Sequence, residues 1–267
     1  SYIDALIKLD RIVDAKAGLN QARQSGAKGD SFDEVEVRLN ILSEVPAEPI
    51  ANKNEPEQNP PQDRLHPLIN LYNQGQFQQA LDEVSKLLLQ FSKSVVLYNL
   101  SGAANSGLGQ LDAAIASYKK ALAIKPDYAD AYNNMGVALQ KQGKLEETLE
   151  AYKKAVTIKP DYAEAYNNMG NVLKEQGKLE EALEAYKKAI TIKPDYAEVY
   201  KNMGASLHEQ GKQEEAIEAY KKALDIKPDY AEAFFNLGVT LNYQGKLEET
   251  VQAYKQALDI KPNYADA

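Results

Sequence analysis

The sequence predicts an all-α solenoid of 34-residue helix–turn–helix units, because one short segment recurs at a constant interval and two amphipathic stripes lie between its copies. The recurring segment is Ile-Lys-Pro-Asp-Tyr, with asparagine in place of aspartate in the last copy, and it occupies residues 124–128, 158–162, 192–196, 226–230 and 260–264. An interval of this length is typical of proteins that stack one pair of helices per repeat.

Residues 129–162 illustrate how each unit is expected to form two helices. The first stripe places residues at helical spacing on one face, namely Tyr132, Met135, Gly136 and Leu139. Gly143 interrupts this pattern, as glycine does at helix C-termini. A second stripe runs from Leu145 to Val156, and Pro160 prevents the second helix from continuing.

Charged residues follow the same plan. Glu146 and Glu147 begin the second helix, and we expect Lys153 and Lys154 to end it, which would complement the helix dipole. Glu150 and Lys154 have the i,i+4 spacing of a helical ion pair. Because other units repeat this arrangement, we interpret it as a solvated outer face.

The composition excludes several classes of protein. The chain has 267 residues, of which 44% are hydrophobic and 26% charged, and this balance is too apolar for a disordered chain. A net charge of −8 argues against broad nucleic-acid binding, which needs a basic surface. No apolar run is long enough to span a membrane. The absence of cysteine excludes disulfides and thiolate metal sites.

These units resemble the tetratricopeptide repeat (TPR) family. The family has small residues at the eighth, twentieth and twenty-seventh places and proline at the thirty-second, which in residues 163–196 are Gly170, Ala182, Ala189 and Pro194. Tyrosine or phenylalanine replaces the usual tryptophan at the fourth place. The resemblance implies a right-handed superhelix whose first helices line a concave, peptide-binding groove.

The resemblance also divides the chain into segments. Residues 1–45 are expected to form a partial TPR and an extra helix, residues 46–60 a linker rich in proline, asparagine and glutamate, and residues 61–94 a degenerate TPR, although Pro67 falls inside its first helical stripe. Five regular repeats then occupy residues 95–264, as 95–128, 129–162, 163–196, 197–230 and 231–264. Residues 265–267 would open another repeat, so we expect the chain to be part of a longer protein. Its compartment stays open, with the cytoplasm favoured.

Candidate binding residues come from the groove places of the family. An asparagine occupies such a place in the last four units, which gives a ladder of Asn134, Asn168, Asn202 and Asn236, whereas the unit 95–128 has Leu100 there. The neighbouring candidates are Asn133, Asn167, Lys201, Asn171 and Lys174. The ladder resembles that in the superhelical arm of O-linked N-acetylglucosamine transferase, which holds extended peptides. A carboxamide both donates and accepts hydrogen bonds, so it can pair with any peptide bond.

Alternative roles exist for these groove residues. Peptide contact is the favoured role of the ladder asparagines, and a role in helix packing alone is the alternative. Phe235 and Tyr243 would either form an apolar pocket or cover the exposed edge of the stack.

The charge of the groove indicates the chemistry of its partner. The second place is acidic in the last four repeats, at Asp130, Glu164, Glu198 and Glu232. Only Lys201 and Lys174 offset these carboxylates. This argues against a clamp for acidic peptide tails and favours a neutral or basic peptide.

No catalytic pattern stands out. His66 and His208 lie on separate repeats, and neither a phosphate-binding loop nor a GxSxG element is present. We therefore expect a non-catalytic protein-interaction scaffold with no cofactor and no metal. The alternative is the substrate-recruiting arm of a larger glycosyltransferase- or sulfotransferase-like enzyme. Self-association through uncapped ends is a third expectation.

Overall fold

The computed structural model describes residues 59–263, and these form only helices and connecting loops. The predictions for residues 1–45 and 265–267, and for most of the linker, lie outside the described residues. The helices of the described part are α4 (Gln62–Asn73), α5 (Phe77–Leu88), α6 (Val95–Gly107), α7 (Leu111–Ile124), α8 (Ala129–Lys141), α9 (Leu145–Ile158), α10 (Ala163–Glu175), α11 (Leu179–Ile192), α12 (Ala197–Glu209), α13 (Gln213–Ile226), α14 (Ala231–Tyr243) and α15 (Leu247–Ile260).

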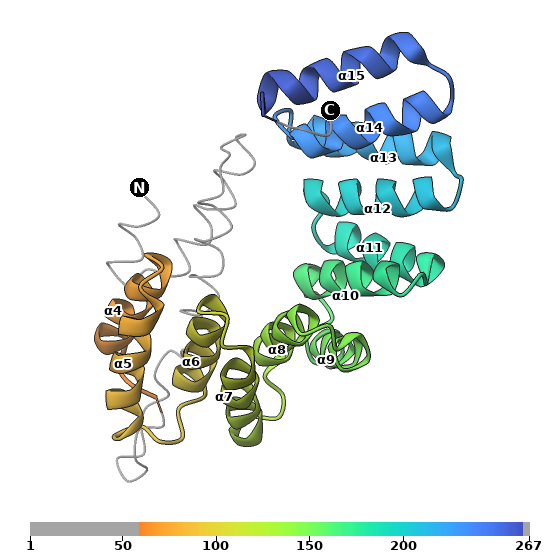
Figure 1. The fold of residues 1–267 in the computed structure, drawn as a ribbon. Helices are drawn as coiled ribbons and strands as arrows, with labels where there is room; N and C mark the ends of the chain where they lie inside the picture. Colours follow the sequence, from red (N-terminus) through yellow and green to blue (C-terminus); the bar gives the residue numbers. More distant parts are fainter. Residues whose placement is uncertain (1–58, 264–267) are drawn as a thin grey trace. The chain divides into compact units, whose positions relative to one another are not determined.

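The chain divides into two units, residues 1–127 and 128–267. In the first unit, α4 packs on α5, α5 on α6 and α6 on α7. In the second, every helix from α8 to α15 packs on the next one in the chain, an order that Figure 1 shows from green to blue. Each unit is thus a helical-repeat solenoid, and the predicted all-α fold class is confirmed.

The closest packing within a helix pair joins a glycine of the first helix to a tyrosine of the second. Tyr186 is fully buried, and a Cβ atom on Gly170 would lie 2.5 Å from its Cε1 atom. The same contact joins Gly136 to Tyr152 and Gly204 to Tyr220. Only glycine allows this approach, because any other side chain would overlap the ring.

A second glycine ends each first helix. Gly177 follows α10 with a φ of +74°, a conformation that favours glycine over all residues with a side chain. Its amide donates to the carbonyl oxygen of Lys174 at 2.8 Å, and the amide of Lys178 donates to that of Leu173 at 2.8 Å. These bonds satisfy the last carbonyl groups of the helix and turn the chain toward α11.

The second helices extend further than the lysine pairs predict. Helix α9 continues to Ile158, so Lys153 and Lys154 lie before its last turn, which contains no basic residue. The prediction that lysines end the helix is wrong, because no helix-stopping residue occurs before Pro160. Lys153 pairs with Glu150 at i,i+3, with 3.2 Å between Nζ and Oε1, where an i,i+4 pair was expected.

Helix α4 tolerates Pro67 in its interior. Its buried side chains are Leu65, Leu68 and Ile69, so the apolar face continues past the proline and packs on α5. None of the helices in residues 59–263 has the length and apolar character that a membrane span requires.

Candidate binding site on the first helices of the second unit

The predicted site residues lie on the first helix of successive pairs, at equivalent places. We call the surface that they mark on α8, α10, α12 and α14 the first-helix face. It is defined by Asn133, Asn134, Asn167, Asn168, Asn171, Lys174, Lys201, Asn202 and Asn236. All belong to the second unit. Asn167, Asn171 and Lys174 share one side of α10, because residues three and four apart lie on the same face of a helix.

Hydrogen bonds between repeats connect the ladder asparagines to their neighbours. The Nδ2 atom of Asn168 donates to Oδ1 of Asn133 at 3.2 Å, and Nδ2 of Asn202 donates to Oδ1 of Asn167 at 3.0 Å. Asn133 and Asn167 are only 7% and 2% exposed, whereas Asn168 and Asn202 are half-buried. Two kinds of asparagine therefore alternate, buried acceptors and partly exposed donors.

A second set of contacts joins the fifth place of one repeat to the second place of the next. The Nδ2 atom of Asn167 lies 3.5 Å from Oε1 of Glu198, and Nζ of Lys201 lies 3.2 Å from Oε2 of Glu232. The sequence shows that these carboxylates are acidic neighbours of the groove, but their partners were missed. The recurring separation of 31 residues was the signal that could have identified them.

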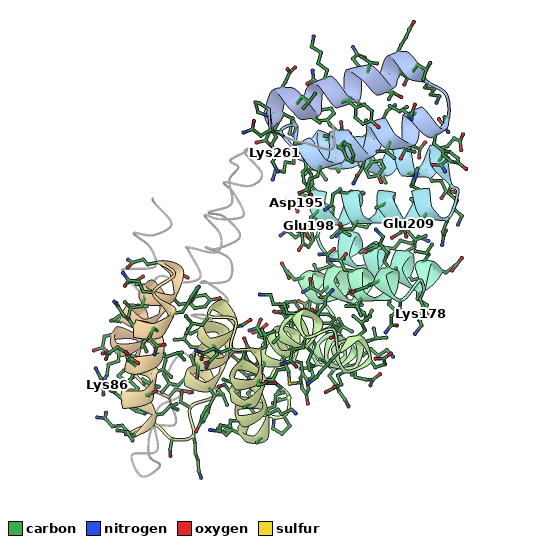
Figure 2. All side chains as sticks on the ribbon, in the orientation of Figure 1. Lys86, Lys178, Asp195, Glu198, Glu209 and Lys261 are labelled. Atoms are coloured by element: carbon green, nitrogen blue, oxygen red, sulfur yellow. The ribbon has the colours of Figure 1, made fainter. Side chains whose placement is uncertain are left out.

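Both lysines of the first-helix face are engaged by carboxylates. Nζ of Lys174 lies 3.0 Å from Oε1 of Glu209, and the Lys201 side chain, paired with Glu232, is only 18% exposed. Figure 2 shows Glu209 at one end of α12 and Glu198, close to Asp195, at the other. The cations of this face are thus neutralised by the chain itself.

Asn171 is held by the buried tyrosine of its own repeat. The hydroxyl of Tyr186 donates to Oδ1 of Asn171 at 2.8 Å. Burial raises the pKa of the Tyr186 phenol and keeps it protonated, so it remains a donor. This bond uses one of the two acceptor positions of Oδ1 and leaves the amide hydrogens of Asn171 unused by Tyr186.

The last ladder residue lacks the kind of partner that Asn168 and Asn202 have. Asn236 follows a repeat with Lys201 at the place of Asn167, and within residues 59–263 its side chain forms no hydrogen bond. The rings of Phe235 and Tyr243 do not pair with each other: Phe235 lies 5.7 Å from Tyr254 and Tyr243 lies 5.9 Å from His208, between ring centroids.

Other parts of the surface offer less chemistry. A hollow of about 520 Å³ lies between α9 and the turn that joins α10 to α11. None of the predicted binding residues lines it. Its lining is Glu146, Leu149, Glu150, Lys153, Gln176 and Lys178. Residues 59–263 contain no group of histidine, aspartate and glutamate side chains that could hold a metal ion.

Comparison with known families identifies the repeats. Residues 108–143, 141–177, 170–211 and 204–242 match a family described as TPR repeat, and residues 231–264 match one described as tetratricopeptide repeat. Together these matches cover more than half of the chain. The chain belongs to the tetratricopeptide repeat family. Arrays of this family are protein-interaction scaffolds, and the helix pairs described above build such a scaffold.

Solved structures of other TPR proteins are similar to this chain. The crystal structure of MamA is 29% identical, with a TM-score of 0.57, over 62% of this chain and 97% of MamA. PilF of Pseudomonas aeruginosa is 18% identical, with a TM-score of 0.68, over 77% of this chain and 93% of PilF. YrrB, described as a TPR protein with an unusual peptide-binding site, is 23% identical, with a TM-score of 0.57, over 68% of this chain and 94% of YrrB. Comparison with curated protein sequences finds no match.

Proposed function

We propose that the first-helix face of this TPR scaffold binds an extended peptide without catalysing a reaction. The hydrogen bonds from Asn168 to Asn133 and from Asn202 to Asn167 carry this proposal. They hold half-buried carboxamides at equivalent points of successive repeats. Each of these carboxamides keeps one N–H and one oxygen for a ligand, and an extended peptide presents complementary groups at regular intervals. The peptide-binding site for which YrrB is described supports the same use of the fold.

The two kinds of asparagine take different roles in this proposal. Asn133 and Asn167 are buried and position the ladder asparagine of the next repeat, so they act in packing between repeats. Asn168 and Asn202 contact the peptide, and Asn134 and Asn236 extend the row. Asn171 adds a donor beside it.

The preferred peptide is neutral or basic. Lys174 and Lys201 are already paired with Glu209 and Glu232, at 3.0 and 3.2 Å, so they have little charge to offer to an acidic ligand. An acidic peptide would in addition meet the carboxylate of Glu198. Like charges at such distances repel, so acidic sequences are disfavoured.

Selection from a random peptide library tests the proposal. Unstructured dodecapeptides displayed on phage are selected on the wild-type chain, and their affinities are measured by calorimetry. The double variant Asn168→Ala/Asn202→Ala is expected to weaken binding roughly tenfold or more, because each lost hydrogen bond contributes about 1 kcal/mol. The matched control, Glu180→Ala/Glu181→Ala, changes two exposed residues of α11 and leaves the affinity unchanged. Equal affinities for all three proteins would contradict the proposal.

We also propose self-association through α15. Val251 is 67% exposed, and Leu247, one turn before it in α15, is exposed as well. The equivalent residue of α13, Ile217, is 7% exposed because α14 covers it. Light scattering is expected to show a mass that rises with concentration, and Val251→Glu should abolish the rise. A constant monomer mass at high concentration would refute self-association.

A further inference from the structure

Helices α12 and α14 receive different side chains from the preceding first helix. At α14, the ammonium of Lys201 lies 3.2 Å from Oε2 of Glu232 and 5.7 Å from the centroid of the Tyr230 ring. At α12, the equivalent place holds Asn167, whose neutral amide lies 3.5 Å from Oε1 of Glu198. The remaining residues correspond, because Tyr196, Glu198 and Asn202 stand where the next repeat has Tyr230, Glu232 and Asn236.

This difference leaves the Glu198 carboxylate of α12 without an ion pair among the described residues. Glu232 is neutralised by the chain's own lysine. Within residues 59–263, no lysine or arginine forms an ion pair with Glu198, although this side chain is exposed. Asp195 lies close to Glu198 in Figure 2, in the loop that leads into α12. The arrangement around α14 therefore shows which kind of group is missing at α12.

The hydrogen-bonding groups at α12 specify this group further. Glu198 and Asn202 are four residues apart and lie on the same face of the helix. Asn202 donates Nδ2 to Oδ1 of Asn167, and Asn167 donates Nδ2 to Glu198, so one buried amide orients both residues. Oε2 of Glu198 and Oδ1 of Asn202 take part in neither bond and can accept from a ligand. A ligand here must supply several donors, and a guanidinium supplies five and accepts none.

We propose that Glu198 and Asn202 form a subsite for an arginine side chain of the bound peptide. The inference rests on the proposed peptide-binding function and adds a preference at one rung. The guanidinium donates to the Glu198 carboxylate and to Oδ1 of Asn202. It takes the place that Lys201 fills at the next repeat. At that repeat the chain's own ammonium excludes a second arginine.

A pair of peptides tests the subsite. The probes are two acetylated and amidated peptides of alternating glycine and serine, nine residues long, with arginine or its neutral isostere citrulline at the centre. Binding to the ¹⁵N-labelled chain is followed through the side-chain amide signals of Asn167 and Asn202. We expect the arginine peptide to bind roughly threefold to tenfold more tightly, the range of an exposed charge-assisted contact.

Three variants sharpen the test. Glu198→Gln is expected to bring the ratio of the two affinities to about one by removing the charge. Asn167→Lys would supply the cation from the chain itself, as Lys201 does at α14, and abolish the ratio as well. Lys201→Asn would vacate Glu232, so the arginine peptide should also shift the amide signals of α14. The matched control, Glu215→Gln, changes an exposed glutamate of α13 and keeps the wild-type ratio.

The outcomes separate this inference from the function on which it rests. Equal binding of the arginine and citrulline peptides, while library-selected peptides still require Asn168 and Asn202, overturns the subsite alone. A preference for arginine that survives both Glu198→Gln and Asn167→Lys also overturns it. Failure of the selected peptides to depend on the ladder overturns the proposed function together with the subsite.

Discussion

The close packing within a repeat requires a glycine as well as the large tyrosine side chain that lies against it. Gly170 lets the Tyr186 ring lie against the backbone of α10, and the ring hydroxyl then reaches Asn171 on the same helix. One contact thus links the core of a repeat to its first-helix face. The sequence predicts a small residue at the place of Gly170, but not this hydrogen bond, because the bond depends on how α10 and α11 pack.

Substitution of this glycine should destabilise the chain although alanine is the better helix former. In Gly170→Ala, overpacking against Tyr186 costs about 1–3 kcal/mol, which exceeds the gain of at most about 1 kcal/mol in helix propensity. The midpoint of urea unfolding, followed by circular dichroism at 222 nm, is expected to fall. Gly177→Asn serves as the control, because asparagine tolerates its positive φ and nothing lies within 4 Å. A midpoint of Gly170→Ala at or above that of the wild type would disprove the packing argument.

Burial of four tyrosines is also expected to make the folded chain less stable at alkaline pH. It raises the pKa of the phenols of Tyr118, Tyr152, Tyr186 and Tyr220 above the usual 10.0. The pKa of these phenols is higher in the folded chain than in the unfolded chain. The free energy of unfolding therefore keeps its full value below pH 10 and falls as the pH rises further, because the unfolded chain releases its phenol protons first.

An absorbance titration measures this effect. The chain has 17 tyrosines, and the exposed ones are expected to ionise first, as read at 295 nm. The buried ones should ionise only as the helical signal at 222 nm disappears. Ionisation of all tyrosines with intact helices would contradict the predicted coupling.

At the scale of helices, the sequence predicts where elements exist better than where they end or what they contact. Periodic apolar residues and Gly143 indicate the two helices of a repeat, but the lysine pairs suggest an end one turn too early. The hydrogen bonds of Asn133 with Asn168 and of Asn167 with Asn202 join residues 35 apart. They follow from the stacking of one repeat on the next, which no local pattern contains. The candidate site was therefore predictable as a row of residues, but not as alternating buried and half-buried asparagines.

The exposure of equivalent residues provides a test at this scale. Ile217 of α13 and Val251 of α15 occupy the same place of their repeats, at 7% and 67% exposure. Ile217→Ala should lower the free energy of unfolding by about 2–5 kcal/mol, because it leaves a cavity in a packed core. Val251→Ala, its matched control, should change the free energy by at most about 0.5 kcal/mol. Similar losses from both, by urea unfolding, would show that Val251 is covered in solution.

At the scale of the whole molecule, the helices of the second unit contact mainly their chain neighbours. Stability in such a solenoid is a sum of repeat and nearest-neighbour terms, so damage is expected to stay local. Among residues 59–263, fully buried side chains occur in both units.

Hydrogen exchange can detect this locality. In Tyr220→Ala, a cavity in α13 should accelerate amide exchange in α12, α13 and α14, whose side chains pack around it. Exchange in α5 and α6, in the other unit, should remain at the wild-type rate. Mass spectrometry of peptic peptides resolves these segments. Uniform acceleration along the chain would indicate a single cooperative unit instead.

The identical connections between repeats have a consequence for the gene. Tyr162 is followed by Ala163 and Tyr196 by Ala197, and in both connections a lysine lies over the tyrosine ring, 4.6 Å away for Lys159 and 4.5 Å for Lys193. Deleting residues 163–196 would therefore recreate a native junction between Tyr162 and Ala197. Unequal recombination between such copies can shorten or lengthen the array by whole repeats without disturbing a junction. Each repeat gained or lost then adds or removes one asparagine of the ladder.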